Sequence, residues 1–354
     1  MLKCDMQCTL LIPHLWWSRD AAGDAYRDLA LPELQTLLSR ARPRNFPATG
    51  WEEWLCRAFE VERQCDWPIA PLTLTIDGGD PGDAYWLRAD PVHLRPHRDQ
   101  LLLADSNAFP VSQAEASALA SALNAHFEGE GLSFSAPRPE RWYLRLADDP
   151  QIATYPLDDV AGTLIDPCLP TGVNALRWHR ISNEIQMLLH AHPVNETREA
   201  NGDLPINGVW LWGGGRRAAV PGRHFSALVS DDALAVALAA NADIPVTPGT
   251  DDGERWLRTA CMTRPAAHHL LVLKQLMEPA RRGDLSAWRS AVEGFDRRWI
   301  APLLAALKTG TIRQLVLVAP GRTGCRRFEL RRADLFRFWR RRRPLADYAP
   351  GAAP

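Results

Sequence analysis

The residues best suited to chemistry are concentrated between His192 and Arg217. Asn195, Arg198 and Asn207 follow a His-Pro pair. Arg can bind a carboxylate or a phosphate through two parallel hydrogen bonds, and Asn can orient hydroxyl groups. The same residue types also fill turns, because Asn and Asp side chains hydrogen-bond to nearby backbone groups. The segment is therefore either an anion-binding loop or structural scaffold.

Three consecutive glycines, Gly213 to Gly215, follow the apolar run GVWLW. Glycines placed after a strand let backbone N–H groups approach an anion closely. The segment matches neither the phosphate loop, which ends in Gly-Lys-Ser/Thr, nor the dinucleotide-binding turn G-x-G-x-x-G. A tight turn after a buried strand is the alternative explanation of these glycines.

A second polar stretch, WLRADPVHLRPHRD, offers Arg88 as a contact for an anion. His93 and His97 are four residues apart and would share one face only on a helix. The prolines between them disfavour a helix, so we expect no metal pair there. No Gly-x-Ser-x-Gly motif is present, and no Cys-His-Asn arrangement is evident, so nucleophilic catalysis of these types is not indicated.

Composition indicates a globular protein in an intracellular setting. The 354 residues are 46% hydrophobic and 23% charged, with a formal net charge of -1. This balance favours neither nucleic acid nor an anionic membrane as a partner. Seven scattered cysteines without a Cys-x-x-Cys pair are typical of reduced thiols, and no signal pattern or membrane-spanning run is visible. We therefore expect a cytoplasmic protein, with an Arg-rich segment at 338–345 that is solvated or contacts an acidic surface.

The elements that must position these residues alternate in type. Strand and helix patterns follow one another in the second half of the chain, which predicts a mostly parallel α/β sheet with helices on both faces and a smaller α+β portion elsewhere. Residues 70–79 alternate like a strand, and Pro193 is expected to end a helix that starts near Asn174. The Asp-, Pro- and Gly-rich stretch 148–172 suggests two portions, residues 1–150 and 151–354, packed as one unit.

Two segments resemble a known family. The stretch HPVNETREANGDLPINGVWLWGGGRR is similar to a segment of archaeal-type cofactor-independent phosphoglycerate mutases. The stretch LVLKQLMEPARRGDLSAWRSAVEGFD resembles a strand-loop-helix of the same family and keeps its Lys274, Glu278, Gly283, Asp284, Glu293 and Asp296. The resemblance covers about residues 160–320 and, more weakly, 85–146. As a whole, the chain resembles the RpfE-type regulatory proteins, a bacterial branch of this family.

The resemblance implies an alkaline phosphatase-like fold, whose members transfer phosphoryl groups with two metal ions and a Ser or Thr nucleophile. Where the family carries metal-binding Asp and His, this chain has Met277 and Arg281, and Pro13-His14 replaces Asp-Gly after the first strand. Neither Met nor Arg is a ligand for a hard metal ion, so we expect neither a metal nor another cofactor. Residues near the substrate site are better kept, and the resemblance implies a ligand-binding set of Arg88, Arg141, His192, Asn195, Arg198 and Asn207.

These observations lead to one leading hypothesis and two alternatives. The first is a non-catalytic regulatory or metabolite-binding protein whose ligand is a small phosphorylated or carboxylate metabolite. The second is an active, divergent, metal-dependent phosphoglycerate mutase or phosphatase that uses other ligands, such as Asp77, Asp90 or His93. The third is a protein–protein adaptor that uses Trp-rich surfaces and the Arg-rich segment.

Overall fold

The chain forms two compact units. The computed structural model describes residues 6–17, 22–97, 100–264, 267–321 and 323–350. Unit 1 combines residues 1–60 with 221–354, and unit 2 comprises residues 61–220.

The predicted boundary at residue 150 falls inside unit 2, between β6 (Arg141–Leu146) and β7 (Ile152–Ala153). Unit 1 is discontinuous because β1 (Met6–Leu11) is hydrogen-bonded between β12 (His268–Val272) and β13 (Ile312–Ala319). Pairing between segments so distant in sequence leaves no local signal at the point where the chain changes units.

Unit 1 is built on a seven-stranded sheet with the order β11-β10-β12-β1-β13-β14-β2. The first five strands in this order are parallel, and β14 is antiparallel to both of its neighbours. The runs HHLLV and LVLVA are buried almost throughout, as expected for parallel strands covered on both faces. The remaining strands of this sheet are β10 (Ala227–Val229), β11 (Val246–Thr247), β14 (Cys325–Arg331) and β2 (Arg42–Phe46).

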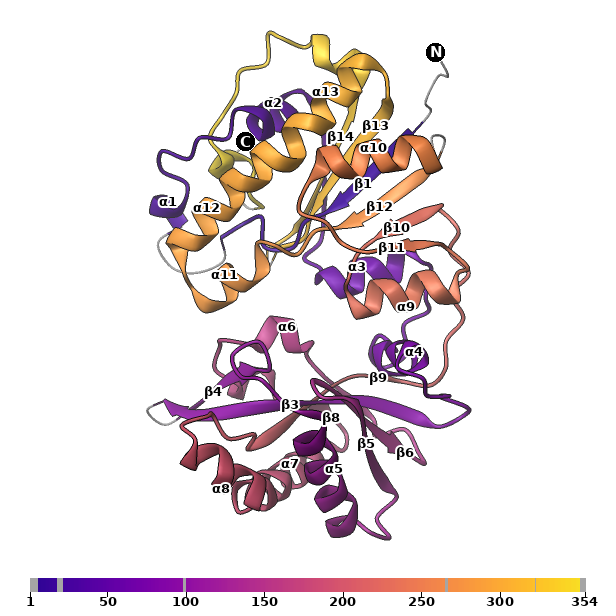
Figure 1. The fold of residues 1–354 in the computed structure, drawn as a ribbon, viewed down its shortest axis with the longest axis vertical. Coiled ribbons are helices and arrows are strands. Elements are labelled where there is room, and N and C mark those ends of the chain that lie inside the picture. The colour runs from indigo at the N-terminus through magenta and orange to yellow at the C-terminus, as the bar shows by residue number, and fades with distance from the viewer. Residues whose placement is uncertain (1–5, 18–21, 98–99, 265–266, 322, 351–354) are drawn as a thin grey trace. The chain divides into compact units, whose positions relative to one another are not determined.

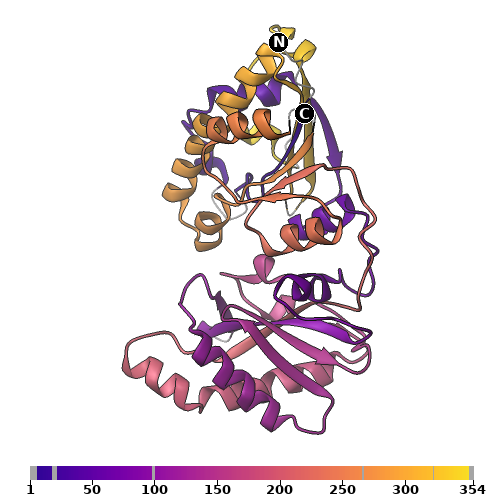
Figure 2. The same cartoon turned by 45° about the vertical axis from the view of Figure 1, so that its right-hand side comes forward.

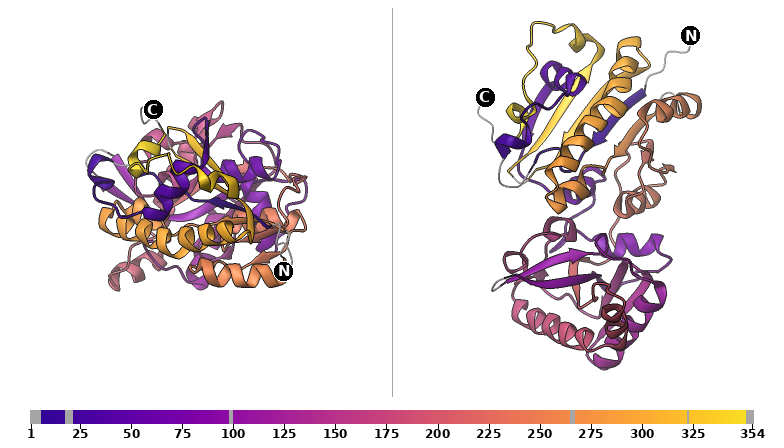
Figure 3. Two further views of the ribbon diagram at one scale, coloured as in Figure 1. Left: turned by 90° about the horizontal axis from the view of Figure 1, so that it is seen from above. Right: turned by 60° about the vertical axis from the view of Figure 1, so that its left-hand side comes forward.

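Helices cover this sheet, and a long helical run lies along it (Figures 1 and 3). The run consists of α12 (Leu285–Phe295), a π-helical turn over Asp296–Ile300, and α13 (Ala301–Thr309). Trp288, Phe295 and Trp299 bury its inner face. The other helices of unit 1 are α1 (Ala22–Ala25), α2 (Pro32–Arg40), α3 (Trp51–Ala58), α9 (Ala233–Asn241), α10 (Gly253–Thr263) and α11 (Met277–Arg282).

Unit 2 contains a five-stranded antiparallel sheet. The long strand β3 (Tyr85–His97) pairs with three others, which are β4 (Gln100–Asp105), β6 and β9 (Gly208–Gly215); β5 (Leu132–Arg138) pairs with β6. Helices α5 (Gln113–His126) and α7 (Ala175–His190) cover one face, and α4 (Ile69–Ile76) covers the other (Figure 2). Smaller elements are α6 (Leu157–Val160), α8 (Pro193–Ala200) and the β7–β8 pair, with β8 at Thr171–Gly172.

Two predicted elements differ in the structure. Residues 69–76 form a helix rather than a strand, and the Thr73 hydroxyl donates to the Ile69 carbonyl 2.9 Å away. Helix α4 is buried on most sides, so its apolar residues give no helical stripe. Pro193 ends α7 as predicted but also starts α8, because its missing N–H costs nothing in a first turn.

The predicted fold class, α/β with a mostly parallel sheet flanked by helices and a smaller α+β portion, is confirmed. None of the helices within the described ranges has both the length and the apolar character needed to cross a membrane.

Candidate functional site

Arg88 lies on β3 and is enclosed by its own unit. Its guanidinium Nη2 contacts the Asp90 carboxylate oxygens at 2.7 and 2.8 Å, and its Nε contacts one of them at 3.1 Å. The rings of Tyr143 and Trp212 flank the guanidinium carbon at 5.4 and 5.2 Å. The indole Nε1 of Trp212 donates to Asp90 at 2.7 Å. This is a buried ion pair between two aromatic walls, and its hydrogen-bonding groups are directed at each other.

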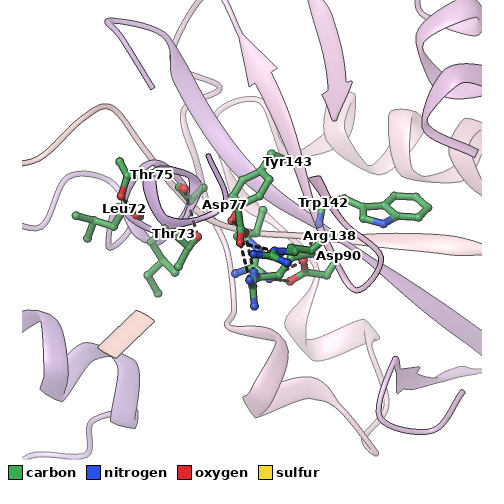
Figure 4. A network of polar contacts seen from close by, with 12 residues as sticks. Leu72, Thr73, Thr75, Asp77, Asp90, Arg138, Trp142 and Tyr143 are labelled. Carbon is green, nitrogen blue, oxygen red and sulfur yellow. Dashed lines mark hydrogen bonds and ion pairs between the residues drawn. The ribbon is translucent and has the colours of Figure 1, made fainter. Parts of the chain in front are cut away.

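A second carboxylate, Asp77, accepts from several donors at the end of α4 (Figure 4). Arg141 reaches it with two bonds of 2.6 and 2.8 Å, the Tyr143 hydroxyl donates at 2.6 Å, and Arg138 donates at 3.3 Å. Burial would raise the pKa of Asp77, but the hydrogen bonds from Arg141 and Tyr143 outweigh it and lower the pKa. The Tyr143 ring also flanks Arg88, so Arg88 and Arg141 belong to one connected network.

The other predicted site residues of unit 2 make bonds inside the scaffold. The Asn195 amide donates to the Leu189 and Ile206 carbonyls at 2.7 and 2.9 Å, and its oxygen accepts from the Ile206 N–H. Asn207 pairs in the same way with the backbone N–H and carbonyl of Leu94. These two amides tie the start of β9 to α7 and β3.

His192 and Arg198 also serve the local structure. His192 caps α8, since its Nδ1 accepts from the Val194 N–H at 3.2 Å. Arg198 donates to the Leu204 carbonyl at 2.7 Å and to the Glu115 carboxylate at 2.8 Å, with only 4% of its side chain exposed. Glu115 also closes the capping box of α5. A ligand-binding role for these residues stays a prediction, and each has a structural role.

Gly213, Gly214 and Gly215 lie on β9 where it packs tightly against its surroundings. A Cβ at Gly214 would lie 2.7 Å from Leu87, and one at Gly215 would lie 2.6 Å from Pro68. Gly213 has φ +64° and faces Ile69 of α4. Close packing around β9 thus accounts for all three glycines.

Replacing Arg198 by Ala is expected to lower the free energy of unfolding by about 2–3 kcal/mol. The change removes a buried guanidinium, so the Leu204 carbonyl and the Oε1 atom of Glu115 lose the donor that Arg198 supplies. Chemical denaturation followed by tryptophan fluorescence measures it. Arg180→Ala, at an exposed position on α7, is the matched control and should change stability by less than about 0.5 kcal/mol. Equal stability of the two variants would contradict the structural role.

In unit 1, three sequence-distant segments meet at the carboxyl ends of parallel strands. Lys274 follows β12, and its Nζ lies 2.8 Å from an Asp232 carboxylate oxygen. Asp232 follows β10, and its other oxygen accepts from the Ala235 N–H at 2.9 Å, which caps α9. The Lys274 ammonium also lies 4.6 Å from the ring centroid of Trp51 in α3. We define these three residues as the Lys274 cluster.

The Lys274 cluster has the properties of an anion contact. Carboxyl ends of strands are where open α/β sheets bind ligands. The Lys274 side chain is 36% exposed, so an anion can reach its ammonium group from solvent. The contacts with Asp232 and Trp51 hold the Lys274 ammonium group in position. The sequence indicated Lys274 only through the family resemblance, because the three segments are remote from one another along the chain.

The described residues at the strand ends do not fit the two metal ions that the resemblance implies. His14 follows β1, Lys274 and Met277 follow β12, and Pro320 follows β13. Within the described ranges, no group of three or more His, Cys, Asp or Glu side chains could hold a metal ion. Ammonium and thioether groups are not ligands for hard divalent cations, and Asp232 is already bonded to Lys274.

The alternative ligands Asp77, Asp90 and His93 do not form a metal site either. Asp77 is bonded to Arg138 and Arg141, and Asp90 to Arg88. His93 Nδ1 lies 2.9 Å from the Pro205 carbonyl. Each of the three has its own protein partner, and the two carboxylates are already neutralised by arginines.

Comparison with known proteins supports the resemblance to cofactor-independent phosphoglycerate mutases. The chain is 27% identical over 295 residues to the probable 2,3-bisphosphoglycerate-independent phosphoglycerate mutase of Geobacter sulfurreducens, covering 78% of this chain and 74% of that protein. It is 28% identical over 236 residues to the corresponding enzyme of Methanosarcina barkeri, covering 62% of this chain and 58% of that enzyme, less than two thirds of its length. No protein-family model matches the chain.

Among solved structures, the PH0037 protein from Pyrococcus horikoshii matches with a TM-score of 0.55 and 13% identity, over 94% of this chain and 88% of that one. A cofactor-independent phosphoglycerate mutase from Thermoplasma acidophilum matches with a TM-score of 0.46 and 16% identity, over 92% and 89%. The chain is therefore similar in sequence to 2,3-bisphosphoglycerate-independent phosphoglycerate mutases and shares the fold of the PH0037 protein.

Proposed function

We propose that this protein binds a small anionic metabolite, phosphorylated or carboxylate, and acts as a regulatory protein of the RpfE type rather than as a metal-dependent mutase. The relatives named above act on phosphoglycerate according to their names, which supports a ligand of that class. The ligand would be recognised by fixed positive charge, without turnover.

The observation that carries the proposal is the Lys274 cluster. A metal-dependent phosphoryl transferase needs hard ligands at its strand ends, so that two cations can activate the nucleophile and neutralise the transferring oxygens. Here Lys274, which the resembled family also has, pairs with Asp232 at the ends of β12 and β10, whereas Met277 and Arg281 stand where that family carries metal ligands. A lysine ammonium held on an aromatic ring and a carboxylate can bind an oxyanion as a point charge, but it cannot activate a hydroxyl nucleophile as a metal does.

A thermal-shift titration with 3-phosphoglycerate and with glycerate tests this proposal. A ligand at 100 times its Kd adds about 2.7 kcal/mol to the stability of the protein, which corresponds to a rise in Tm of roughly 5–10 °C for a unit of this size. We expect Lys274→Met to weaken binding at least tenfold. Lys308→Met removes an exposed lysine from α13 and is the matched control, with binding unchanged.

Metal content and turnover are measured on the same preparation. We expect less than stoichiometric manganese after purification in its presence, and no mutase or phosphatase activity. Stoichiometric metal together with turnover would establish the enzyme alternative instead. If neither phosphoglycerate nor glycerate shifts the Tm of the wild-type protein, the metabolite proposal is wrong.

A further inference from the structure

The segment from Phe336 to Arg343 combines exposed aromatic rings with positive charge. Phe336, Phe338 and Trp339 are 69%, 79% and 68% exposed. Arg341 and Arg342 follow them and are exposed as well, and neither has an ion-pair partner among the described residues. We call residues 336–343 the Arg–aromatic segment. Large apolar side chains grouped on a surface mark interaction sites, because leaving them in water is unfavourable.

The Arg–aromatic segment is held in place rather than being a loose tail. Arg337 bonds to the Asp334 carboxylate at 2.8 Å and to the Arg40 carbonyl at 3.2 Å, and Arg340 donates to the Ala41 carbonyl at 3.0 Å. These carbonyls lie at the C-terminal end of α2, where cations are favoured. Buried leucines, Leu335 and Leu345, fix the chain on both sides. The segment runs beside α2 in Figures 1 and 3.

Because two arginines serve as anchors, the rings are presented outward on a fixed backbone. The Phe338 N–H donates to the Phe336 carbonyl at 2.8 Å, which turns the chain tightly between the two rings. The rings of Phe338 and Trp339 meet edge to face, with centroids 5.5 Å apart. A preordered surface of this kind loses little conformational entropy when a partner binds. Trp and Arg are also the residues that contribute most to protein–protein interfaces.

The edge strand of the sheet extends this surface. All five residues of β2 are exposed, and Arg42 bonds to Asp334, the same carboxylate that holds Arg337. Arg44 and Phe46 lie further along β2 and repeat the pairing of cation and aromatic ring. The surface is thus cationic and aromatic on two adjacent elements of unit 1.

The distribution of charge favours one class of partner. Residues 331–343 contain seven Arg and one Asp, a net charge of +6, so the rest of the chain carries -7 within the formal total of -1. A nucleic acid or an anionic membrane is an extended polyanion, and the net charge of -7 on the rest of the chain does not favour it. A short acidic segment stays within a Debye length, roughly 8–10 Å, of the arginines. Arg binds carboxylates bidentately, and the rings match apolar side chains between them.

We propose that the Arg–aromatic segment is the docking surface for a short acidic segment of a partner protein, one in which carboxylates alternate with apolar side chains. This proposal is independent of metabolite binding at the Lys274 cluster. It adds a partner interface to unit 1.

Fluorescence anisotropy with defined probes tests the docking surface on the full chain. The first probe is a labelled 12-residue peptide of alternating Glu and Leu, and its controls are peptides of alternating Glu and Ser and of alternating Gln and Leu. We expect the Glu-Leu peptide to bind at least tenfold more tightly than either control peptide. Raising the salt concentration should weaken the binding of the Glu-Leu peptide, because salt screens the attraction between its carboxylates and the arginines.

Two double variants separate the rings from the charges. Phe338→Ala with Trp339→Ala, and Arg341→Gln with Arg342→Gln, should each weaken the Glu-Leu peptide at least tenfold. Both sites are exposed, so the Tm should stay unchanged. Arg177→Gln with Arg180→Gln, at exposed positions on α7, is the matched control and should leave binding unchanged.

Three outcomes would overturn the proposal. The first is no binding of the Glu-Leu peptide to the wild-type protein. The second is equal affinity in the wild type and in either double variant. The third is tighter binding of a 12-nucleotide oligothymidylate, or of vesicles containing phosphatidylserine, which would assign the surface to nucleic acid or to a membrane.

Discussion

Replacing Arg88 by Met is expected to lower the free energy of unfolding by roughly 3–5 kcal/mol. The side chain is buried on β3, and its removal leaves the Asp90 carboxylate without its counter-ion between Tyr143 and Trp212. A buried carboxylate without a counter-ion must either stay charged where it is poorly solvated or take up a proton. Urea denaturation of the full chain, followed by tryptophan fluorescence, measures the loss.

Two further variants show whether the stability lost in Arg88→Met comes from breaking the Arg88–Asp90 ion pair. Arg95→Met, at an exposed position on the same strand, removes an arginine without breaking a buried bond and should change stability by less than about 0.5 kcal/mol. Arg88→Met combined with Asp90→Asn removes both charges and should recover part of the loss, because the amide oxygen can still accept from Trp212. If Arg88→Met is as stable as the wild type, the ion pair with Asp90 does not stabilise the fold, and a ligand-binding role for Arg88 is favoured instead.

Replacing Asp77 by Asn is expected to lower the free energy of unfolding by about 3 kcal/mol at neutral pH. The carboxylate is only 1% exposed, and its bonds to Arg138, Arg141 and Tyr143 join β5 and β6 to the end of α4. An amide can still accept hydrogen bonds through its oxygen, but its N–H group faces the guanidinium donors. The same urea experiment measures this loss, and Asp80→Asn, three residues away and exposed, is the matched control.

The stability lost in Asp77→Asn should depend on pH in a defined direction. The folded protein lowers the pKa of Asp77 below its unfolded value of about 3.9. The stabilisation by the carboxylate is therefore complete above about pH 4 and is lost as the pH falls through the folded pKa. The difference between wild type and Asp77→Asn should stay constant from pH 8 to about pH 5 and shrink below pH 4. A difference that persists at low pH would mean that shape, rather than charge, holds the network.

These predictions fall on residues whose chemistry the sequence indicated but whose partners it did not. The sequence predicts that Arg88 and Arg198 contact a ligand because Arg can bind an anion through two hydrogen bonds, and the family resemblance adds Arg141. In the structure each guanidinium meets a carboxylate of the same unit, namely Asp90, Asp77 and Glu115. Glu115 is 83 residues from Arg198 along the chain, and Asp77 is 64 residues from Arg141. No local pattern identifies such partners.

Elements with strong local signals could be predicted from the sequence. The Ser112–Glu115 capping box marks the start of α5, and the apolar runs at β12 and β13 mark buried strands. These signals are local, because a helix cap involves neighbouring backbone groups and a strand buried on both faces needs a continuous apolar run. Helix α4 was mistaken for a strand, since burial on most sides removes the periodicity that distinguishes the two.

By itself, then, the sequence determined the mixed α/β class, most of the elements and the kinds of side chain available for binding. The tertiary structure decided which segments form a unit, because β1 enters its sheet between strands more than 250 residues away. It also decided which polar groups bond to each other and which can meet a ligand. Asn195 and Arg198 became part of the scaffold of unit 2, and Lys274 met Asp232 and Trp51 at the strand ends of unit 1. The physical reason is that burial and pairing depend on contacts between distant segments, which only the folded chain creates.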